Sequence, residues 1–171
     1  PVLEISSSMD IGDSPAGQLG RVYAFSNAQQ VKLYKNDVFV TDLARSEWDS
    51  LPHPPFVVDD TIGELLETQE HFAPAKAALL RDCLLAAGKY GLPGLPLSYK
   101  LKLGWCMLRY KMTFADGVAL YGKYVGNWGG AATRWRFDAV QDGKVVRSVT
   151  LCPGTKLHLE VRTSRMALRE A

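Results

Sequence analysis

The residues of this chain with the most chemical potential are its carboxylates, because two closely spaced carboxyl groups can divide acid and base roles. Asp59 and Asp60 are the only adjacent acidic pair, and side chains that are neighbours in sequence usually point apart. Both precede an apolar pattern with helical spacing, where negative charge suits a helix N-terminus. Glu64, Glu67 and Glu70 recur every three residues and are typical of a solvated helix face. We therefore predict no catalytic carboxylate pair.

Hydroxyl and imidazole side chains give no stronger catalytic signal. Ser6–Ser8 are not part of the Gly-x-Ser-x-Gly pattern that exposes a nucleophilic serine. His71 follows Glu70 where a helix is expected to end, which favours a role at the terminal carbonyls, with a general base as the alternative. His53 and His158 are expected at the surface. The sequence also has no glycine-rich phosphate loop.

The cysteines, Cys83, Cys106 and Cys152, are odd in number and far apart in the sequence. Two of them lie inside apolar helical patterns, which favours buried free thiols over disulfides and favours a reducing, cytoplasmic location, with secretion as the open alternative. The cysteines and histidines show none of the spacings that are typical of zinc sites. We expect no metal site and no cofactor.

Loop tryptophans are the main indication of ligand binding. Trp128 and Asn127 lie in a glycine-rich stretch, where an indole face can stack on a sugar ring and the amide can reach a hydroxyl. The alternative is a structural junction in which Trp128 covers the edge of the core. Trp48 is a second loop candidate for sugar binding. Trp105 and Trp135 lie on apolar stripes and are expected in the core.

Composition and charge exclude several classes of partner. Hydrophobic residues make up 47% of the 171 residues and charged residues 22%, as in ordinary globular domains. The net charge is +2, and the basic residues near the C-terminus are spread along strands, so nucleic acid is not an expected partner. No apolar run reaches the roughly 18 residues of a membrane span, so we expect no membrane partner. The chain begins at Pro1, and we expect it to be a segment of a longer protein.

The apolar periodicity predicts strands, then helices, then strands again. The expected strands are 3–5, 21–27, 31–34, 38–41, 134–139, 144–151 and 157–161, with hairpin turns at 35–37 and at Asp142 and Gly143. Residues 50–58 contain three prolines, so we predict a linker or an edge strand there and not a central strand.

Four helices are expected between residues 59 and 126. The first begins with a capping box from Thr61 to Glu64, the second begins at Pro74, and the last begins with Thr113 and Asp116. An apolar stripe on the third helix and another on the last helix are both expected to face the core. Their members are Leu97, Leu101, Trp105, Leu108 and Met112 on the third helix, and Phe114, Val118, Tyr121 and Val125 on the last.

These elements assemble most economically into an α+β domain. Residues 1–50 and 127–171 form one antiparallel β-sandwich, because neither set of strands has enough members to cover a face alone. Residues 51–126 form a helical insertion of about four helices between strands of the sandwich.

Three stretches of the sequence share a pattern with a known family. They are residues 1–10 (PVLEISSSMD), residues 22–36 with Val-Tyr-x-x-Ser-Asn followed by Val-x-Leu, and residues 137–146 (FDAVQDGKVV). Together they resemble the immunoglobulin-like region that follows the catalytic barrel in glycoside hydrolase family 2, the β-galactosidase-like enzymes. The resemblance does not extend to the helical insertion, and Asn36-Asp37 stands where that family usually has Asn-Gly.

The resemblance implies an immunoglobulin-like sandwich and a parent protein that is a retaining glycosidase, with two catalytic glutamates on a barrel outside this chain. The chain itself is then expected to be a non-catalytic C-terminal accessory domain that packs on the catalytic barrel of the parent chain. One alternative is a carbohydrate-binding module that uses Trp48, Asn127 and Trp128. Another is a protein-interaction or oligomerisation domain whose helical insertion binds another subunit, including a second copy.

Overall fold

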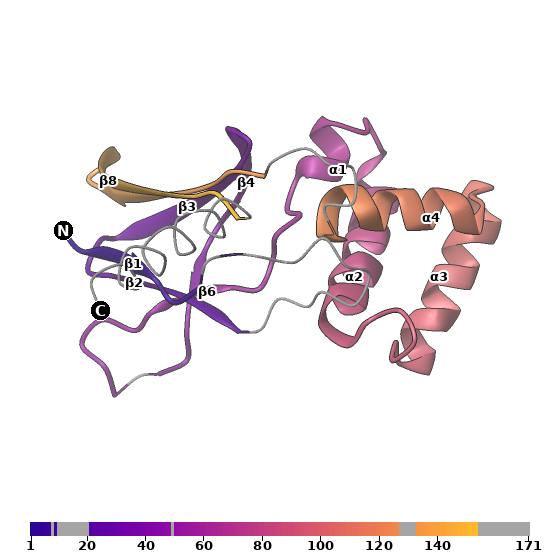
Figure 1. Cartoon of the computed structure of the whole chain (residues 1–171), viewed down its shortest axis with the longest axis horizontal. Coiled ribbons are helices and arrows are strands. Elements are labelled where there is room, and N and C mark those ends of the chain that lie inside the picture. The colour runs from indigo at the N-terminus through magenta and orange to yellow at the C-terminus, as the bar shows by residue number, and fades with distance from the viewer. Residues whose placement is uncertain (8, 10–20, 49, 127–132, 154–171) are drawn as a thin grey trace, which may run out of the picture.

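The computed structural model of the chain describes residues 1–7, 9, 21–48, 50–126 and 133–153. The described residues form two antiparallel sheets of four strands and a set of helices, so the predicted α+β architecture is confirmed. The strands lie in one half of the molecule and the helices in the other (Figure 1). Asn127, Trp128, His158 and the strand expected at 157–161 lie outside the described residues.

The two sheets combine strands from before and after the helices. The first sheet has the order β1 (Leu3–Ile5), β2 (Val22–Ser26), β6 (Phe56–Val58) and β5 (Ala44–Arg45). The second has the order β4 (Val38–Asp42), β3 (Gln30–Lys35), β7 (Trp135–Gln141) and β8 (Lys144–Leu151). Strand β3 pairs with β7 from Gln30 opposite Val140 to Lys35 opposite Trp135, so residues about a hundred positions apart complete one sheet.

Both predicted hairpin turns are present. Asn36 and Asp37 connect β3 to β4 with positive φ angles of 49° and 65°. Asp142 and Gly143 connect β7 to β8 with φ angles of 50° and 73°. Asn, Asp and Gly tolerate this left-handed region, which matches the twist of the flanking strands.

The prediction that residues 50–58 form a linker or an edge strand was wrong for the last three of them. Strand β6 is an interior strand, since Val57 is paired with Tyr23 of β2 on one side and with Ala44 of β5 on the other. The prolines do not prevent this pairing because β6 begins directly after Pro55. The sandwich therefore extends into the segment that was expected to belong to the helical insertion.

The helical part consists of α1 (Leu65–Thr68), α2 (Pro74–Tyr90), α3 (Leu97–Tyr110), α4 (Phe114–Tyr121) and a π-helical turn, η1 (Gly122–Gly126). Helix α2 begins with Pro74 at its first turn, as predicted. The capping box before α4 is also confirmed, because the Asp116 amide donates to Thr113 Oγ1 and the Thr113 amide donates to the Asp116 carboxylate.

The capping box predicted for the first helix is absent. The Asp60 carboxylate instead accepts hydrogen bonds from the amides of Ile62 and Gly63, at 3.0 and 2.7 Å. The chain turns at Gly63 with φ of 48°, so α1 begins only at Leu65, beyond the reach of Thr61. Asp60 thus places the expected negative charge before α1, but its carboxylate binds the amides of a turn and does not cap the helix.

The sandwich and the helical part share one continuous apolar core. Leu65 and Leu66 of α1 are buried together with Leu33 and Val40 of the second sheet. At this junction the Glu64 amide donates to the Val40 backbone oxygen at 3.2 Å. The helical part is therefore anchored on β4, and α3 lies at the end of the molecule away from the sheets (Figure 1).

Candidate functional site

The outer face of α3 exposes four large apolar side chains, which we call the docking face. Leu97 is 72% exposed, Leu101 66%, Trp105 57% and Leu108 83%. The prediction that the stripe belongs to the core was therefore wrong for these four residues, whereas Met112, its last member, packs against the core. Trp135, the other tryptophan expected in the core, is 1% exposed, as predicted.

The reason for this error is that α3 has a second apolar face. Cys106 is fully buried, and Leu103 and Met107 are partly buried where α3 packs on α2. Both faces repeat every three or four residues, so apolar periodicity alone does not tell which of them meets the rest of the molecule. Cys83 of α2 is buried as well, so the prediction of buried free thiols is confirmed for Cys83 and Cys106.

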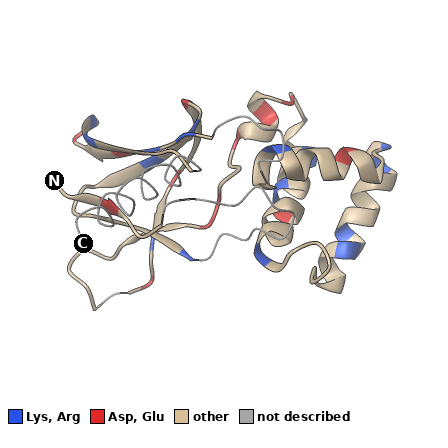
Figure 2. Cartoon of the chain, in the orientation of Figure 1, with Lys and Arg blue, Asp and Glu red and all other residues tan. Residues whose placement is uncertain are grey.

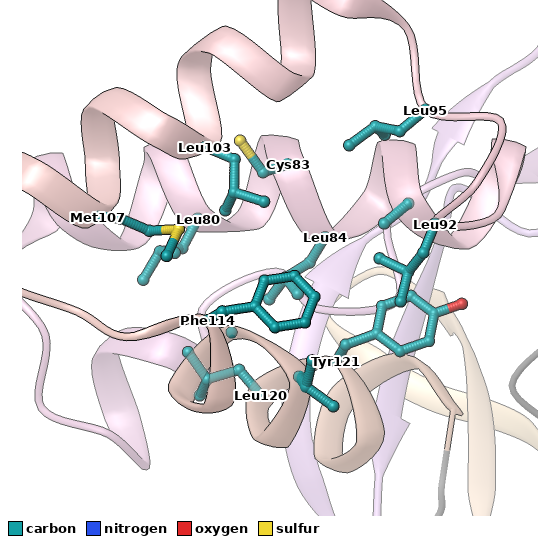
Figure 3. A pocket seen from close by; sticks show the side chains of 13 residues that line it. Leu80, Cys83, Leu84, Leu92, Leu95, Leu103, Met107, Phe114, Leu120 and Tyr121 are labelled. Atoms are coloured by element: carbon teal, nitrogen blue, oxygen red, sulfur yellow. The ribbon is translucent and has the colours of Figure 1, made fainter.

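An apolar pocket lies between α2, α3 and α4, and α3 lines it with residues of its second apolar face (Figure 3). Its free volume is about 40 Å³. The side chains around it include Leu80 and Leu84 of α2, Leu103 and Met107 of α3, and Phe114 and Leu120 of α4. A water molecule needs polar partners in such a space, and this lining offers almost none. The pocket is therefore suited to an apolar group.

Phe114 lines this pocket although the last helix was expected to bury it. Its side chain is 63% exposed, whereas Tyr121 and Val125 of the same predicted stripe are 2% and 6% exposed. Phe114 is the first residue of α4, where the chain has just left α3, and the two helices diverge from that point (Figure 1). The start of α4 thus adds an exposed apolar side chain at the edge of the pocket.

Two glycines lie inside these helices although no close contact within the described chain requires a residue without a side chain. A Cβ added at Gly104 of α3 or at Gly117 of α4 would meet no atom within 4 Å. Glycine inside a helix destabilises it by roughly 1 kcal/mol relative to alanine. Both positions therefore give up helix stability and leave the helix backbone open to close approach from outside.

The charged residues of α3 itself are all basic. No acidic residue occurs between Asp82 and Asp116, a segment that contains Lys89, Lys100, Lys102, Arg109 and Lys111. Helix α3 accordingly carries only basic charge in Figure 2. Lys102 pairs with Asp82 at 2.5 Å, but none of the ion pairs among the described residues involves Lys100, Arg109 or Lys111.

A second candidate site is an aromatic cluster on the outer face of the first sheet. The ring of Trp48 lies 5.0 Å from that of Tyr23, whose ring centre is 6.4 Å from that of Phe25. Trp48 and Phe25 are each 44% exposed. Glu4 is exposed and directly opposite Phe25 in the sheet, so it adds a carboxylate acceptor beside the rings. Sequence reasoning found Trp48 but not its two neighbours, which only the strand pairing brings to it.

Lys35 lies in a buried polar cluster at the junction with the helical part. Its ammonium donates to the backbone oxygens of Lys123 and Tyr124, and it lies 5.2 Å from the centre of the Trp135 ring. Burial, followed by repulsion from Lys123, lowers the pKa of Lys35 to about 8. Because the side chain is only 7% exposed and its donors are engaged by carbonyl oxygens, its role is structural.

Glu70 was expected on a solvated helix face and instead belongs to this junction. Helix α1 ends at Thr68, and the Glu70 carboxylate accepts hydrogen bonds from Tyr124 and Lys123, both at 2.5 Å. Burial alone would raise the pKa of Glu70, but these two hydrogen bonds outweigh it and hold the pKa below its usual value. A carboxylate engaged in this way is not available to His71 as part of a catalytic pair.

The described residues contain no group of three or more His, Cys, Asp or Glu side chains placed to hold a metal ion. Within the same residues, no helix combines the length and the apolar character needed to cross a membrane. Comparisons with known proteins found no matching family model, no similar curated protein and no similar solved structure.

Proposed function

We propose that this chain is a non-catalytic accessory domain that docks onto another protein surface through the exposed face of α3. The observation that carries the proposal is the exposure of Leu97, Leu101, Trp105 and Leu108 on one side of one helix. A contiguous apolar patch of this kind is typical of interaction sites. Burying one such side chain contributes about 1.5–3 kcal/mol, so covering the face would supply several kcal/mol of binding free energy.

We also propose that the sandwich is of the immunoglobulin-like type found after the barrel of β-galactosidase-like glycoside hydrolases. The order of strands supports this: lettered along the chain, the sheets run A-B-E-D and C′-C-F-G, with the helical part between E and F. The similar stretches at residues 1–10, 22–36 and 137–146 support it as well. The protein surface that receives the docking face would then be the catalytic module of the parent protein.

The docking function is tested by comparing two lysine substitutions on opposite faces of α3. Leu108→Lys should change the free energy of unfolding by less than about 0.5 kcal/mol, because the side chain is already in solvent. Leu103→Lys should lower it by roughly 2–4 kcal/mol, because it places a charge against α2. Both are measured by urea unfolding of the whole chain. A large loss of stability in Leu108→Lys would show that the chain itself covers this face and would refute the docking function.

The non-catalytic character has its own test. The isolated chain should not hydrolyse nitrophenyl β-galactoside or related nitrophenyl glycosides. Hydrolysis that is abolished by a substitution within the chain, such as Glu67→Gln or Asp59→Asn, would contradict it.

A second candidate function, sugar binding, is favoured by the cluster of Trp48, Tyr23 and Phe25. Exposed rings side by side offer the platform on which a sugar face can stack, with Glu4 to accept a hydroxyl hydrogen bond. Calorimetric titration with galactosides and plant oligosaccharides should give saturable binding that Trp48→Ala removes while the unfolding transition is unchanged. The matched control is Phe39→Ala, which removes a ring from the other sheet. No heat at millimolar sugar would exclude this function.

A further inference from the structure

We propose that the docking face binds an acidic amphipathic helix, which seats one apolar side chain in the pocket between α2, α3 and α4. The inference rests on the proposed docking function and specifies the partner. Helix α3 has 14 residues and is therefore about 21 Å long, which suits a partner helix of three to four turns. Laying an amphipathic helix along an apolar groove is a common mode of recognition.

Gly104 lies between the docking face and the pocket-lining Met107 around the axis of α3. On a helix, residues three and four positions apart are neighbours, so Gly104 adjoins Leu101 and Leu108 of the docking face and Met107 at the pocket. A partner backbone can approach closely at this point because nothing lies within 4 Å of a Cβ built there. Gly117, which lines the same pocket from α4, is equally open. One bound helix can therefore contact Leu101 and Leu108 while a side chain of it enters the pocket.

The charge pattern selects an acidic partner. Lys100 borders the apolar stripe on one side and Arg109 on the other, as the spacing of 100° per residue requires. Neither forms an ion pair with a described acidic residue, so both are available to carboxylates of a partner. Complementary charges at the rim of an interface mainly determine specificity and the rate of association.

The same charges argue against a second copy of this chain as the occupant. Two docking faces brought together would place Lys100 and Arg109 of one copy against basic residues of the other, since the segment between Asp82 and Asp116 has no acidic residue. Like charges that face each other across an interface are strongly disfavoured.

The shape of the surface argues against an anionic lipid bilayer. A bilayer would be attracted by the basic rim, but it makes no use of a pocket of about 40 Å³ or of helix backbone opened by Gly104. These two features suit a partner with defined side chains and a backbone that approaches closely.

The experiment uses the whole chain and two synthetic helical peptides. Both peptides carry leucines at every third or fourth position, and they differ only in that one has Glu and the other Lys at the flanking positions. Binding is followed by calorimetry and by amide chemical shifts at low and at moderate salt. The Glu peptide should bind at least about tenfold more tightly than the Lys peptide, and more weakly as salt increases.

Three variants separate the contributions to this binding. The double variant Lys100→Glu and Arg109→Glu should reverse the preference between the two peptides. Gly104→Leu should weaken the Glu peptide about tenfold or more by blocking the approach, while the free energy of unfolding stays equal or rises. Lys144→Glu, on the exposed strand β8, is the control and should leave binding unchanged.

Each other outcome overturns the inference and identifies its replacement. Equal binding of both peptides would contradict the inference that the partner helix is acidic. Sedimentation of the chain with phosphatidylserine vesicles, lost in Leu108→Lys, would replace the helix with a membrane. Self-association that Leu108→Lys abolishes, without peptide binding, would replace it with a second copy. Equal peptide binding or a second copy leaves docking onto a protein surface in place, as long as the comparison of Leu103→Lys with Leu108→Lys holds. A membrane as the occupant, or failure of that comparison, removes both the docking function and the inference.

Discussion

The side-chain nitrogen of Lys35 lies 3.1 Å from the backbone oxygen of Tyr124, and this contact connects the second sheet of the sandwich to the π-helical turn that ends the helical part. The same nitrogen lies 3.3 Å from the oxygen of Lys123. A buried ammonium thus satisfies carbonyl oxygens that would otherwise lack donors at a helix end. The Lys35 side chain therefore joins the second sheet to the end of the helical part.

Stability between pH 8 and 10.5 should depend on Lys35. Its pKa is about 8 in the folded protein and 10.5 as the ordinary value, so in this window the unfolded chain binds more protons and stability rises with pH. From pH 7.5 to 9.5 the free energy of unfolding of the wild-type chain should increase by about 1–2 kcal/mol relative to Lys35→Met. Urea unfolding at a series of pH values measures this. If the free energies of unfolding of wild type and Lys35→Met ran parallel with pH, the lowered pKa of Lys35 would be contradicted. Lys144→Met, at an exposed lysine, serves as the control.

Removing the Tyr124 hydroxyl should weaken the same junction. Tyr124→Phe leaves Glu70 without one of its two donors, and we expect a loss of about 1–3 kcal/mol in the free energy of unfolding at neutral pH. Because the pKa of Glu70 is lowered in the folded state, its contribution is present above the ordinary value of 4.5 and is lost as the pH falls through the folded value. The difference between wild type and Tyr124→Phe should therefore shrink in acid.

Tyr34→Phe is the matched control for this prediction, because Tyr34 lies on the outer side of the sheet against Phe39. It should change stability by less than about 0.5 kcal/mol. A difference between wild type and Tyr124→Phe that stays constant down to pH 3 would assign the effect to packing and not to the carboxylate.

Alanine substitutions at two glycines should separate backbone strain from steric clash. Gly63 and Gly143 both have positive φ, but a Cβ at Gly63 would lie 1.8 Å from the Val40 oxygen, whereas at Gly143 it would meet nothing. Gly143→Ala should lower the thermal midpoint modestly, with a loss of about 1 kcal/mol. Gly63→Ala should be far more damaging, with a loss of more than roughly 3 kcal/mol or failure to fold. Similar losses at both positions would show that β4 moves aside.

Thiol reagents should distinguish the cysteines by burial. Burial is the main cause that raises the pKa of Cys83, to about 11, and it raises the pKa of Cys106 as well. Thiolate is the reactive form, so both should react with a chromogenic disulfide at pH 8 only as the protein unfolds, whereas the exposed Cys152 should react at once. The expected initial release is one equivalent, rising to three in urea. Immediate reaction of Cys106 would show that α3 separates readily from α2.

Several local features follow from the sequence alone. The turn at Asn36 and Asp37, the capping box of Thr113 with Asp116, and the start of α2 at Pro74 depend on the backbone preferences of a few adjacent residues. The alternation of Trp135, Phe137 and Ala139 likewise requires a buried strand face, and all three are at most 1% exposed. Such features need no knowledge of distant segments, and the prediction from sequence was correct for each.

Other features depend on contacts between segments that are far apart in the sequence. Phe56–Val58 became an interior strand because β2 and β5 pair with it on both sides, which the prolines before it do not reveal. Glu70 became a junction residue because Tyr124, 54 positions later, reaches it. Trp48 gained its aromatic neighbours because the strand that carries Tyr23 and Phe25 runs beneath it.

Helix α3 shows most clearly where prediction from the sequence ends. The sequence by itself determined that residues 97–110 form a helix with apolar positions, because spacing of three and four residues expresses the pitch of a helix. Which apolar face is covered was decided by the tertiary structure, since α2 packs against Cys106 and Met107 and leaves Leu101 and Leu108 in solvent. A periodic sequence specifies directions around a helix axis, but only the packing of other elements specifies which direction is the interior.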